Sequence, residues 1–408
     1  MRIFYNFGIL LYKCLIFLAT PFNPKAAKFI AGRKQVFSSL KKAIEPDARY
    51  IWIHVASLGE FEQGRPIMEA VKRLHPEYKL LLTFFSPSGY EVRKNYQGAD
   101  IITYLPIDTD WNARKFIRIA NPSLAIFIKY EFWINYLSQL KKRGIPTYIV
   151  SAIFRESQAF FKWYGGFYRR LLANYNHLFV QDQNSVNLLA SIGIKNVSIA
   201  GDTRYDRVAE IARQAKKLPI IEAFKGDKKV LVAGSSWSKD ENLLIPYINR
   251  NENIKFIIAP HEVKEERIRE IAGKLTRPFV LYSQTTEEEV ANAGCIIIDC
   301  IGLLSSIYRY GEIAYIGGGF GVGIHNTLEA AVYGMPVIFG PNYKKFMEAV
   351  ELAEAGAGFP VSNEEEFTSI MDNLLNDAGM LTKTAEIARS FVSSNCGATD
   401  KVVEALFV

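Results

Sequence analysis

The sequence predicts an α/β protein of two Rossmann-like domains, each with a parallel sheet that helices cover on both faces. From residue 50 onward, short β-branched and aromatic runs alternate with amphipathic stretches, and the runs are nearly continuous in apolar residues, as in strands buried on both faces. The alternation breaks once, at a polar helical stretch, 207–228, that contains no strand. A chain of 408 residues is also too long for a single ordinary core.

The expected strands define the domains. In the first domain, 45–207, they are 50–55, 79–84, 101–106, 124–128, 147–152 and 177–181. In the second, 208–380, they are 229–234, 255–260, 279–283, 295–299, 313–319, 336–340 and 358–361. A helical segment at 381–408 packs on the second domain or crosses back to the first. Ligands of open parallel sheets bind beyond the carboxyl ends of strands, so we expect two sheets facing a central cleft and look for function directly after strands.

The first 44 residues differ from the rest in charge. They hold eight Lys and Arg and no Asp or Glu, so they carry +8 and leave −1 for the remaining 364 residues. A nucleic-acid-binding protein has its basic surface on the folded body, whereas a basic arm beside an apolar stretch is typical of binding to anionic lipid. We therefore expect a membrane partner for residues 1–44 and no nucleic-acid partner.

Residues 3–20 are almost wholly apolar and are expected to form a helix. Its polar residues fall close to one line along the helix, which favours a helix lying in the membrane interface. The polar residues are Arg2, which directly precedes this stretch, and Asn6, Lys13 and Thr20 within it. The length also permits a span, and a helix buried in the folded body is the structural alternative. A signal peptide is disfavoured, because no small-residue cleavage site precedes Pro21 and Pro24.

Two glutamates follow expected strands of the first domain. Glu60 comes after the strand at 50–55, where a carboxylate facing the cleft can serve as a general base. The structural alternative is a capping box between Ser57 as N-cap and Glu60. Glu131 follows the strand at 124–128 and is expected in the first turn of the next helix, where its charge complements the helix dipole.

A Gly-rich turn at 317–341 stands out in the second domain. The run GGGFGVGIHNTLEAAVYGMPVIFGP starts after a strand and enters a helix near Asn326. Backbone N–H groups of such a turn approach a phosphate closely, and Glu329 can accept hydrogen bonds from ribose hydroxyls. The run matches neither a dinucleotide fingerprint nor a P-loop and is typical of sugar-nucleotide sites. A tight strand-to-helix turn is the alternative, although it needs fewer glycines.

His261 and Gly302 follow two further strands and extend the wall of this expected site. A histidine there can bind a phosphate or a base, although a lone histidine at a strand end is more often structural. No HExxH motif, acidic pair at a strand end or metal-spaced histidine set is present, so chemistry without a metal or cofactor is expected. The four cysteines form no CxxC pair and are interpreted as reduced thiols of a cytosolic body.

Taken in order, these motifs resemble those of the bacterial Kdo transferases, which add 3-deoxy-D-manno-octulosonic acid (Kdo) to a lipid A precursor. The resemblance covers nearly the whole chain. Its motifs are SLGE at 57–60, SPSGYE at 86–91, YEFW at 130–133, AGDTRYD at 200–206, PHEVKEER at 260–267 and GIHNTLEAAVYGMPVIFGPNYKKF at 323–346. The sequence departs from the family pattern at His261, often Arg; at 317–319, which lack a Ser; at Thr327, in place of Pro; and at Lys129, often acidic.

The resemblance implies a GT-B fold and an inverting, metal-independent glycosyltransferase of lipopolysaccharide biosynthesis. It implies CMP-Kdo as donor, lipid IVA as acceptor, and a location at the cytoplasmic face of the bacterial inner membrane. Glu60 matches the general base, Glu131 a second essential acid, and Arg204 a basic residue that steadies the transition state. The positions matching the CMP site are Pro260, His261, Ile301, Gly302, Leu303, Asn326, Thr327, Leu328 and Glu329.

Two other functions stay open from the sequence. One is a transferase or epimerase of the same architecture that uses a UDP-sugar, although soluble epimerases of that kind lack an apolar arm. The other is a membrane-tethered module that binds a glycolipid without turnover.

Overall fold

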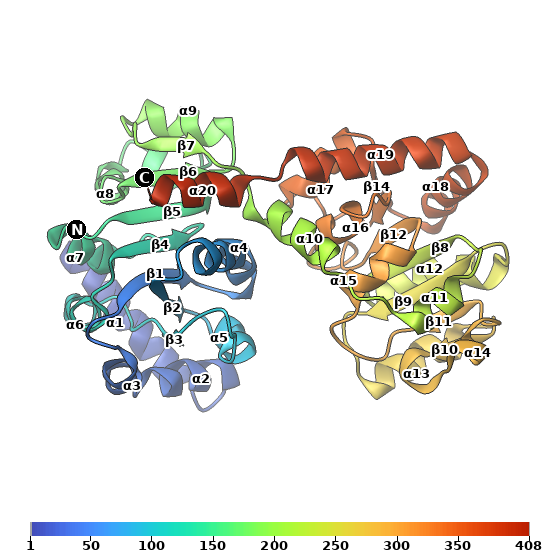
Figure 1. The fold of residues 1–408 in the computed structure, drawn as a ribbon, viewed down its shortest axis with the longest axis horizontal. Coiled ribbons are helices and arrows are strands. Elements are labelled where there is room, and N and C mark those ends of the chain that lie inside the picture. Colours follow the sequence, from blue (N-terminus) through green and yellow to red (C-terminus); the bar gives the residue numbers. More distant parts are fainter. Residues whose placement is uncertain (1, 408) are drawn as a thin grey trace. The chain divides into compact units, whose positions relative to one another are not determined.

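In the computed structural model, which describes residues 2–407, the chain forms two α/β units (Figure 1). The first unit contains the chain up to Arg207 together with the segment from Cys396 onward, and the second is Val208–Asn395. Each unit has a seven-stranded sheet in which every pairing is parallel. The predicted fold class is confirmed.

The first sheet has the order β3-β2-β1-β4-β5-β6-β7. Its strands are β1 (Arg49–Val55), β2 (Tyr78–Phe84), β3 (Ile101–Tyr104), β4 (Leu124–Ile128), β5 (Thr147–Ala152), β6 (His177–Val180) and β7 (Val197–Ile199). Strand β7 was not predicted, because it is a three-residue edge strand whose side chains are largely exposed and therefore lack an apolar run. Strand order reverses between β1 and β4, so their carboxyl ends form the crevice in which open sheets bind ligands.

The second sheet repeats this plan with the order β10-β11-β9-β8-β12-β13-β14. Its strands are β8 (Val230–Ser236), β9 (Lys255–Pro260), β10 (Phe279–Leu281), β11 (Cys295–Ile297), β12 (Ile313–Ile316), β13 (Val337–Phe339) and β14 (Gly358–Pro360). The order reverses between β8 and β12, so the segments that follow these two strands meet at its crevice.

Each unit also contains helices, most of which pack around its sheet. In the first unit they are α1 (Arg2–Ala19), α2 (Pro24–Arg33), α3 (Val36–Ala43), α4 (Leu58–Leu74), α5 (Pro87–Arg93), α6 (Asp110–Ala120), α7 (Ile134–Lys142), η1 (Ala159–Phe161), α8 (Gly166–Leu172), α9 (Gln183–Ser191), the start of α10 (Thr203–Arg213) and α20 (Ala398–Leu406). In the second they are α11 (Pro219–Lys225), α12 (Ser238–Arg250), α13 (Glu265–Lys274), η2 (Tyr282–Gln284), α14 (Glu287–Val290), α15 (Leu304–Ile307), η3 (Tyr308–Tyr310), α16 (Leu328–Ala331), α17 (Met347–Glu354), α18 (Glu364–Asn376) and α19 (Ala378–Ser394).

Strand β1 shows how the first sheet is buried on both faces. Tyr50 and Trp52 belong to an apolar cluster on one face. Ile51, Ile53 and Val55 belong to a cluster on the other face, and all five side chains are buried. Burying each of these large side chains contributes about 1.5–3 kcal/mol, which accounts for the near-continuous apolar run.

The C-terminal segment is two helices rather than the single one expected at 381–408. Helix α19 packs on α16 and α18 of the second unit, whereas α20 packs on α4 of the first. Asp206 caps the start of α20, because its carboxylate accepts the N–H groups of Gly397 (2.6 Å) and Thr399 (2.7 Å). This contact gives the Asp of the AGDTRYD motif a structural role.

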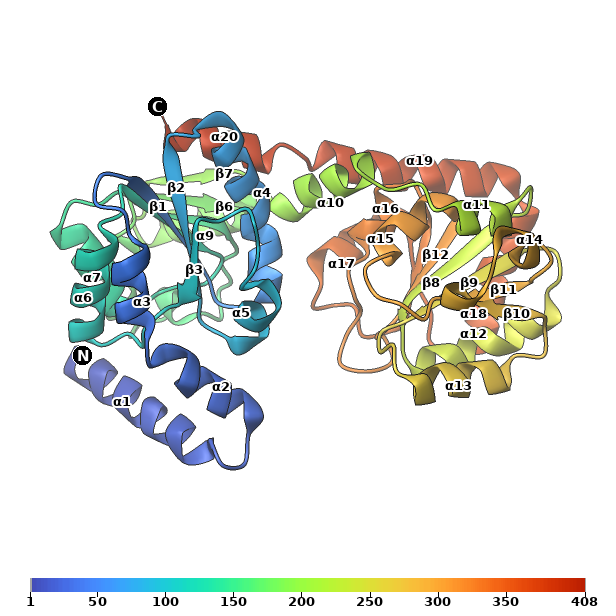
Figure 2. The same cartoon turned by 60° about the horizontal axis from the view of Figure 1, so that its bottom comes forward.

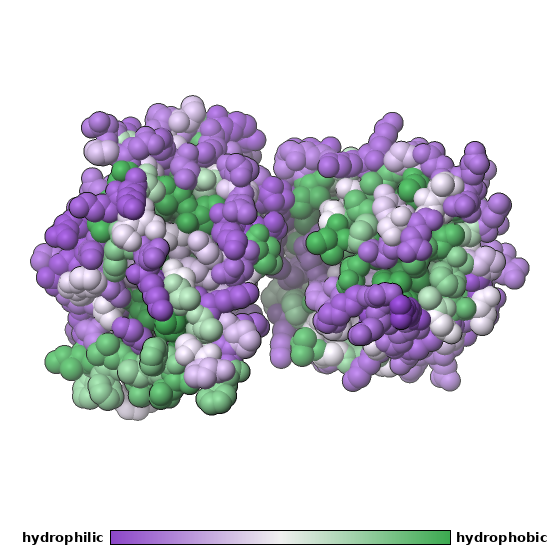
Figure 3. Space-filling model, turned by 90° about the horizontal axis from the view of Figure 1, so that it is seen from below, coloured by the Kyte–Doolittle hydropathy of each residue, from purple (hydrophilic) through white to green (hydrophobic). Residues whose placement is uncertain are grey.

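Helices α1 and α2 lie side by side at one edge of the first unit (Figure 2). No residue of α1 is buried, so the alternative of a helix inside the folded body is wrong. By length and composition, α1 is apolar enough to cross a membrane. Figure 3 shows hydrophobic residues gathered along this edge. The exposed ones on α1 and just after it are Ile3, Phe4, Phe7, Leu10, Leu11, Tyr12, Leu15, Phe17, Leu18 and Phe22.

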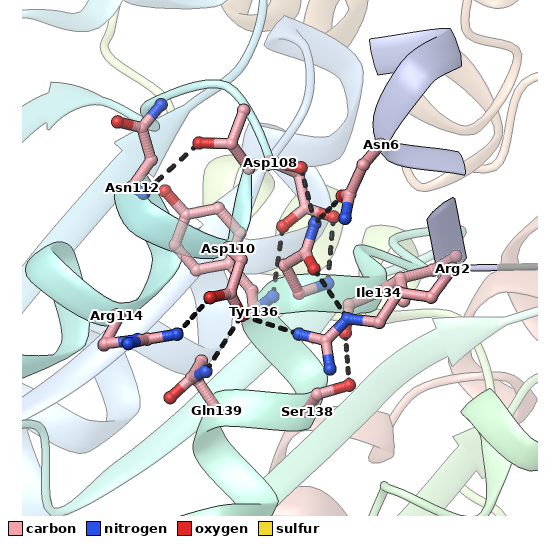
Figure 4. Close-up of polar contacts among 12 residues, drawn as sticks. Arg2, Asn6, Asp108, Asp110, Asn112, Arg114, Ile134, Tyr136, Ser138 and Gln139 are labelled. Atoms are coloured by element: carbon pink, nitrogen blue, oxygen red, sulfur yellow. Dashed lines mark hydrogen bonds and ion pairs between the residues drawn. The ribbon is translucent and has the colours of Figure 1, made fainter. Parts of the chain in front are cut away.

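The N-terminal end of the polar stripe on α1 contacts the first unit (Figure 4). Arg2 donates to Asn135 Oδ1 (3.1 Å) and forms an ion pair with Asp110 (2.7 Å). Asn135 in turn donates to Asn6 Oδ1 (2.8 Å). Polar contacts thus fix the first turns of α1 against α6 and α7, and its apolar face stays uncovered.

Arg33 also stabilises the fold of the first unit. Its guanidinium stacks 3.6 Å from the ring centre of Phe29 and donates to the carbonyl oxygens of Leu105 (2.9 Å) and Phe85 (2.6 Å). Burial lowers the pKa of Arg33 to about 10. Because its donors are used inside the protein, Arg33 differs from the exposed lysines of the basic arm.

Candidate active site

Glu60 lies in the first turn of α4, directly after β1. Its carboxylate accepts the backbone N–H of Ala56, whereas the Ser57 hydroxyl makes no capping bond, so the Ser57 half of the expected capping box is absent. Burial, followed by the negative charge of Glu131, raises the pKa of Glu60 to about 7. A carboxylate with this pKa can exchange a proton near neutral pH.

Glu131 lies in the loop after β4, three residues before α7 begins at Ile134, so its predicted place in the first turn of a helix is wrong. Lys129 turns the chain after β4 with a left-handed φ of 71°. Asp108 provides the negative charge at the start of α7, accepting the N–H groups of Asn135 and Tyr136 (both 3.1 Å).

The Glu131 carboxylate is buried and has two side-chain donors. Its Oε2 lies 3.0 Å from His54 Nε2 and accepts from Trp133 Nε1. His54 Nδ1 lies 2.8 Å from Thr83 Oγ1, which orients the imidazole. His54 was not predicted, and the available signal was a polar residue inside an otherwise buried strand. Since β1 and β4 are neighbours, the structure brings Glu60 and Glu131 within electrostatic range of each other.

Arg204 is held at the start of α10 by buried Asp202. Its Nε donates to Asp202 Oδ2 (2.8 Å), and its backbone N–H donates to Oδ1 (2.9 Å). Gln63 of α4 also donates to Asp202 Oδ1 (3.1 Å), which links this arginine to the helix that carries Glu60. Burial raises the pKa of Tyr130, and the charges of Glu60 and Arg204 both act on it. The three predicted catalytic residues therefore gather on one edge of the first unit.

In the second unit, His261 follows Pro260 at the end of β9 and stacks against two rings that also contact each other. Its ring centre is 4.5 Å from that of Trp237 and 4.4 Å from that of His325, with interplanar angles of 26° and 23°. Burial and the neighbouring His261 lower the pKa of His325 to about 4, so this imidazole is neutral at neutral pH. Its Nε2 then accepts from Trp237 Nε1 (3.2 Å), and its proton is on Nδ1. Trp237 and His325 were not predicted, although both follow strands of the crevice.

Close backbone packing accounts for part of the Gly-rich turn. A Cβ on Gly317 would lie 2.2 Å from the carbonyl oxygen of Ser235, and Gly318 has a φ of 93°. Gly318 N–H donates to buried Asp240 (2.9 Å). The N–H groups of Gly317, Gly321 and Gly323 donate to backbone carbonyls at 2.9–3.3 Å. The expectation that glycine N–H groups bind phosphate is wrong for these four, because protein oxygens already accept them.

The segment 326–329 ends in the short helix α16, which begins at Leu328 rather than near Asn326. Asn326 Oδ1 accepts the Leu328 N–H (3.1 Å), and its Nδ2 donates to Glu329 Oε1 (3.1 Å). The Thr327 hydroxyl is buried and has no hydrogen-bond partner within residues 2–407. A buried hydroxyl without a partner is costly, so this oxygen is a candidate ligand contact.

The remaining predicted CMP positions follow β11. Ile301 is 86% exposed, Gly302 has a φ of 89°, and Leu303 is the N-cap of α15. Tyr333, which follows α16, donates to the carbonyl of Ser305 (2.8 Å) and so joins α15 to the end of the Gly-rich segment. In the described part of the chain, no group of three or more His, Cys, Asp or Glu is arranged to hold a metal ion.

The comparisons of sequence find similarity to one enzyme family. The family model described as 3-deoxy-D-manno-octulosonic-acid transferase (kdotransferase) matches residues 31–207. The chain is 28% identical over 334 residues to the 3-deoxy-D-manno-octulosonic acid transferase of Aquifex aeolicus, which covers 80% of this chain and 86% of that protein. It is 25% identical over 426 residues to the Haemophilus influenzae protein of the same name, which covers 99% and 98%.

Solved structures share the fold. The UDP-GlcNAc 2-epimerase of Neisseria meningitidis, bound to UDP-GlcNAc, aligns with a TM-score of 0.63 at 17% identity, covering 88% of this chain and 99% of that one. MurG of Acinetobacter baumannii aligns with a TM-score of 0.53 at 14% identity, covering 88% and 98%. At these identities the likeness concerns the GT-B fold alone.

Proposed function

Because the chain belongs to the 3-deoxy-D-manno-octulosonic acid transferase family, we propose that it moves Kdo from CMP-Kdo to lipid IVA at the cytoplasmic face of the bacterial inner membrane. The proposed reaction is inverting and proceeds without a metal. The observation that carries the proposal is Glu60, a largely buried carboxylate directly after β1 with a pKa of about 7.

In the proposed mechanism, Glu60 accepts the proton of the acceptor hydroxyl that attacks the anomeric carbon of Kdo. CMP leaves from the opposite face, so the configuration inverts. A general base is most effective when its pKa lies near the working pH, and the environment of Glu60 brings its pKa there.

Glu131 and Arg204 have supporting roles in this proposal. The charge of Glu131 contributes to the raised pKa of Glu60, and the bonds from His54 and Trp133 hold its carboxylate in position. Arg204, oriented by Asp202, offers a fixed positive charge for the Kdo carboxylate or the departing phosphate.

We assign the second unit to the donor. Rings of Trp237, His261 and His325 form an aromatic cluster on which a nucleobase can pack, and Thr327 offers an unpartnered hydroxyl. Pro260, 301–303 and 326–329 complete the proposed CMP site. CMP is a monophosphate leaving group, so the reaction has no diphosphate that needs a metal counter-ion.

The membrane proposal rests on α1 and the lysines that follow it. Because polar contacts at its N-terminal end hold α1 against the folded unit, its exposed apolar face suits a helix that lies in the interface. The exposed lysines add attraction to anionic lipid. They are Lys25, Lys28, Lys34, Lys41 and Lys42.

Replacing these five lysines by Gln is expected to weaken binding to anionic liposomes by about 10-fold or more at 0.1 M salt, and less at 0.5 M. Sedimentation with vesicles of phosphatidylglycerol measures this. Arg33 is left intact because it stabilises the fold. Replacing five exposed lysines outside the arm is the control, namely Lys239, Lys264, Lys344, Lys383 and Lys401. Unchanged sedimentation of the arm variant would show that the lysines have no membrane role.

The decisive test of function is release of CMP from CMP-Kdo in the presence of lipid IVA, with the lipid product followed by mass spectrometry. We expect CMP release that depends on lipid IVA and a product heavier by Kdo. CMP-Kdo binding without turnover would indicate a binding module, and thermal stabilisation by UDP but not CMP would indicate a UDP-sugar enzyme.

A further inference from the structure

An apolar cavity of about 500 Å³ lies in the first unit, beside the loop that carries Glu131. Its lining is mainly aromatic and comes from α1, the 129–133 loop, η1 and α8; it includes Phe4, Tyr5, Phe132, Phe160, Phe167 and Tyr168. The volume is within the range of about 300–1,000 Å³ typical of small-ligand sites. Nothing in the proposed chemistry of Glu60, Glu131 and Arg204 uses this cavity.

The loop before α7 connects the cavity to the candidate active site. Tyr130, Phe132 and Ile134 line the cavity. The intervening Glu131 and Trp133 instead contact each other through the Glu131 carboxylate, which also bonds His54. Alternate residues of one short segment therefore line the cavity and form the carboxylate site. An occupant of the cavity would contact the residues that flank Glu131 in the sequence.

The wall that α1 contributes is firmly attached. The Tyr5 hydroxyl donates to Asp108 Oδ2 (2.6 Å), and the same carboxylate accepts the first N–H groups of α7. On the opposite wall, Phe132 packs on Phe160 with ring centres 4.8 Å apart. The cavity is thus formed by packed side chains on both sides.

The cavity is continuous with the exposed apolar surface of α1. Phe4 lines the cavity, yet it is 76% exposed and belongs to the face that is proposed to contact the membrane. Between η1 and α8, Trp163 is 93% exposed and Tyr164 55%. Exposed Trp and Tyr are typical of membrane interfaces, so the second wall also leads to a surface suited to lipid.

We infer that this cavity takes one acyl chain of the lipid acceptor and thereby positions the acceptor's sugars beside the Glu131 loop. The inference rests on the proposed function. Transfer of methylene groups from water to an aromatic lining is favourable. A sugar or phosphate would lose its hydration there without finding enough polar partners. The cavity opens toward the surface that faces the lipid, which favours a chain of the acceptor over a soluble apolar molecule.

Ala159→Trp tests the inference, because Ala159 lines the cavity and is partly exposed, so a larger side chain can fill the space without entering the core. Kinetics are compared in detergent with two acceptors, lipid IVA and the same disaccharide bisphosphate stripped of its acyl chains. We expect the KM for lipid IVA to rise about 10-fold and kinetics with the stripped acceptor to stay unchanged.

Ser157→Trp is the matched control, since Ser157 is exposed two residues away and does not line the cavity. If Ala159→Trp does not fold, Ala159→Leu gives the same comparison with less added volume. Equal losses on both acceptors, or no loss on either, would overturn the inference. Weaker liposome binding with an unchanged KM for lipid IVA would also overturn it and assign the cavity to bulk phospholipid. Failure of the wild-type chain to use either acceptor would refute the proposed function instead.

Discussion

Glu60→Gln is expected to lower the rate of Kdo transfer about 10²–10⁴-fold and to leave CMP-Kdo binding close to wild type. Gln keeps the size of the side chain and can still accept the Ala56 N–H, but it cannot take a proton from the acceptor hydroxyl. Single-turnover transfer to lipid IVA and calorimetric titration with CMP-Kdo measure the two quantities separately. Near-normal turnover would remove Glu60 from the mechanism.

The same substitution is expected to stabilise the fold at alkaline pH by about 3 kcal/mol, because each unit of pKa shift corresponds to about 1.36 kcal/mol. Below pH 4, Glu60 is protonated in both folded and unfolded chains, so Glu60→Gln should change little. As pH rises toward 7, the unfolded chain loses its proton while the folded one, with a pKa of about 7, keeps it, and the wild type loses stability. Urea unfolding at pH 4, 6 and 8 measures this gain, with the exposed Glu156→Gln as control.

Glu131→Ala is expected to destabilise the first unit by about 2–5 kcal/mol and to abolish measurable transfer. The reason is that His54 Nε2 and Trp133 Nε1 would both lose their buried acceptor. Chemical unfolding and single-turnover transfer measure these effects. A change in the free energy of unfolding below 1 kcal/mol would mean that water or another side chain replaces the carboxylate.

Glu131→Gln separates the electrostatic role of Glu131 from its structural one. Since the charge of Glu131 helps raise the pKa of Glu60, its removal should lower that pKa. In the wild type, kcat/KM should rise with pH through about 7 as Glu60 ionises, and in the variant this rise should occur at lower pH. An unshifted profile with reduced kcat would leave Glu131 with a positioning role only.

The sequence was sufficient for most of the fold because buried parallel strands leave a strong local signal. The runs around Trp52 and Ile126 were recognisable without any tertiary information. β7 left no such signal, since its side chains are exposed at a sheet edge. The position of Glu131 could not be predicted for a related reason: Asp108, distant in sequence, is the residue that caps α7.

By itself, the sequence determined the two-sheet α/β architecture, the basic and apolar N-terminal segment, and the candidates Glu60, Glu131 and Arg204, because periodicity, charge and motif order are properties of neighbouring residues. Only the tertiary structure decided which candidates act on one another. Parallel pairing of β1 with β4 brings Glu60 and His54 to Glu131, and the burial of Glu60 together with the charge of Glu131 raises the pKa of Glu60 to about 7. Burial and electrostatic coupling depend on distances across the sheet, and these distances cannot be read from the spacing of residues along the chain.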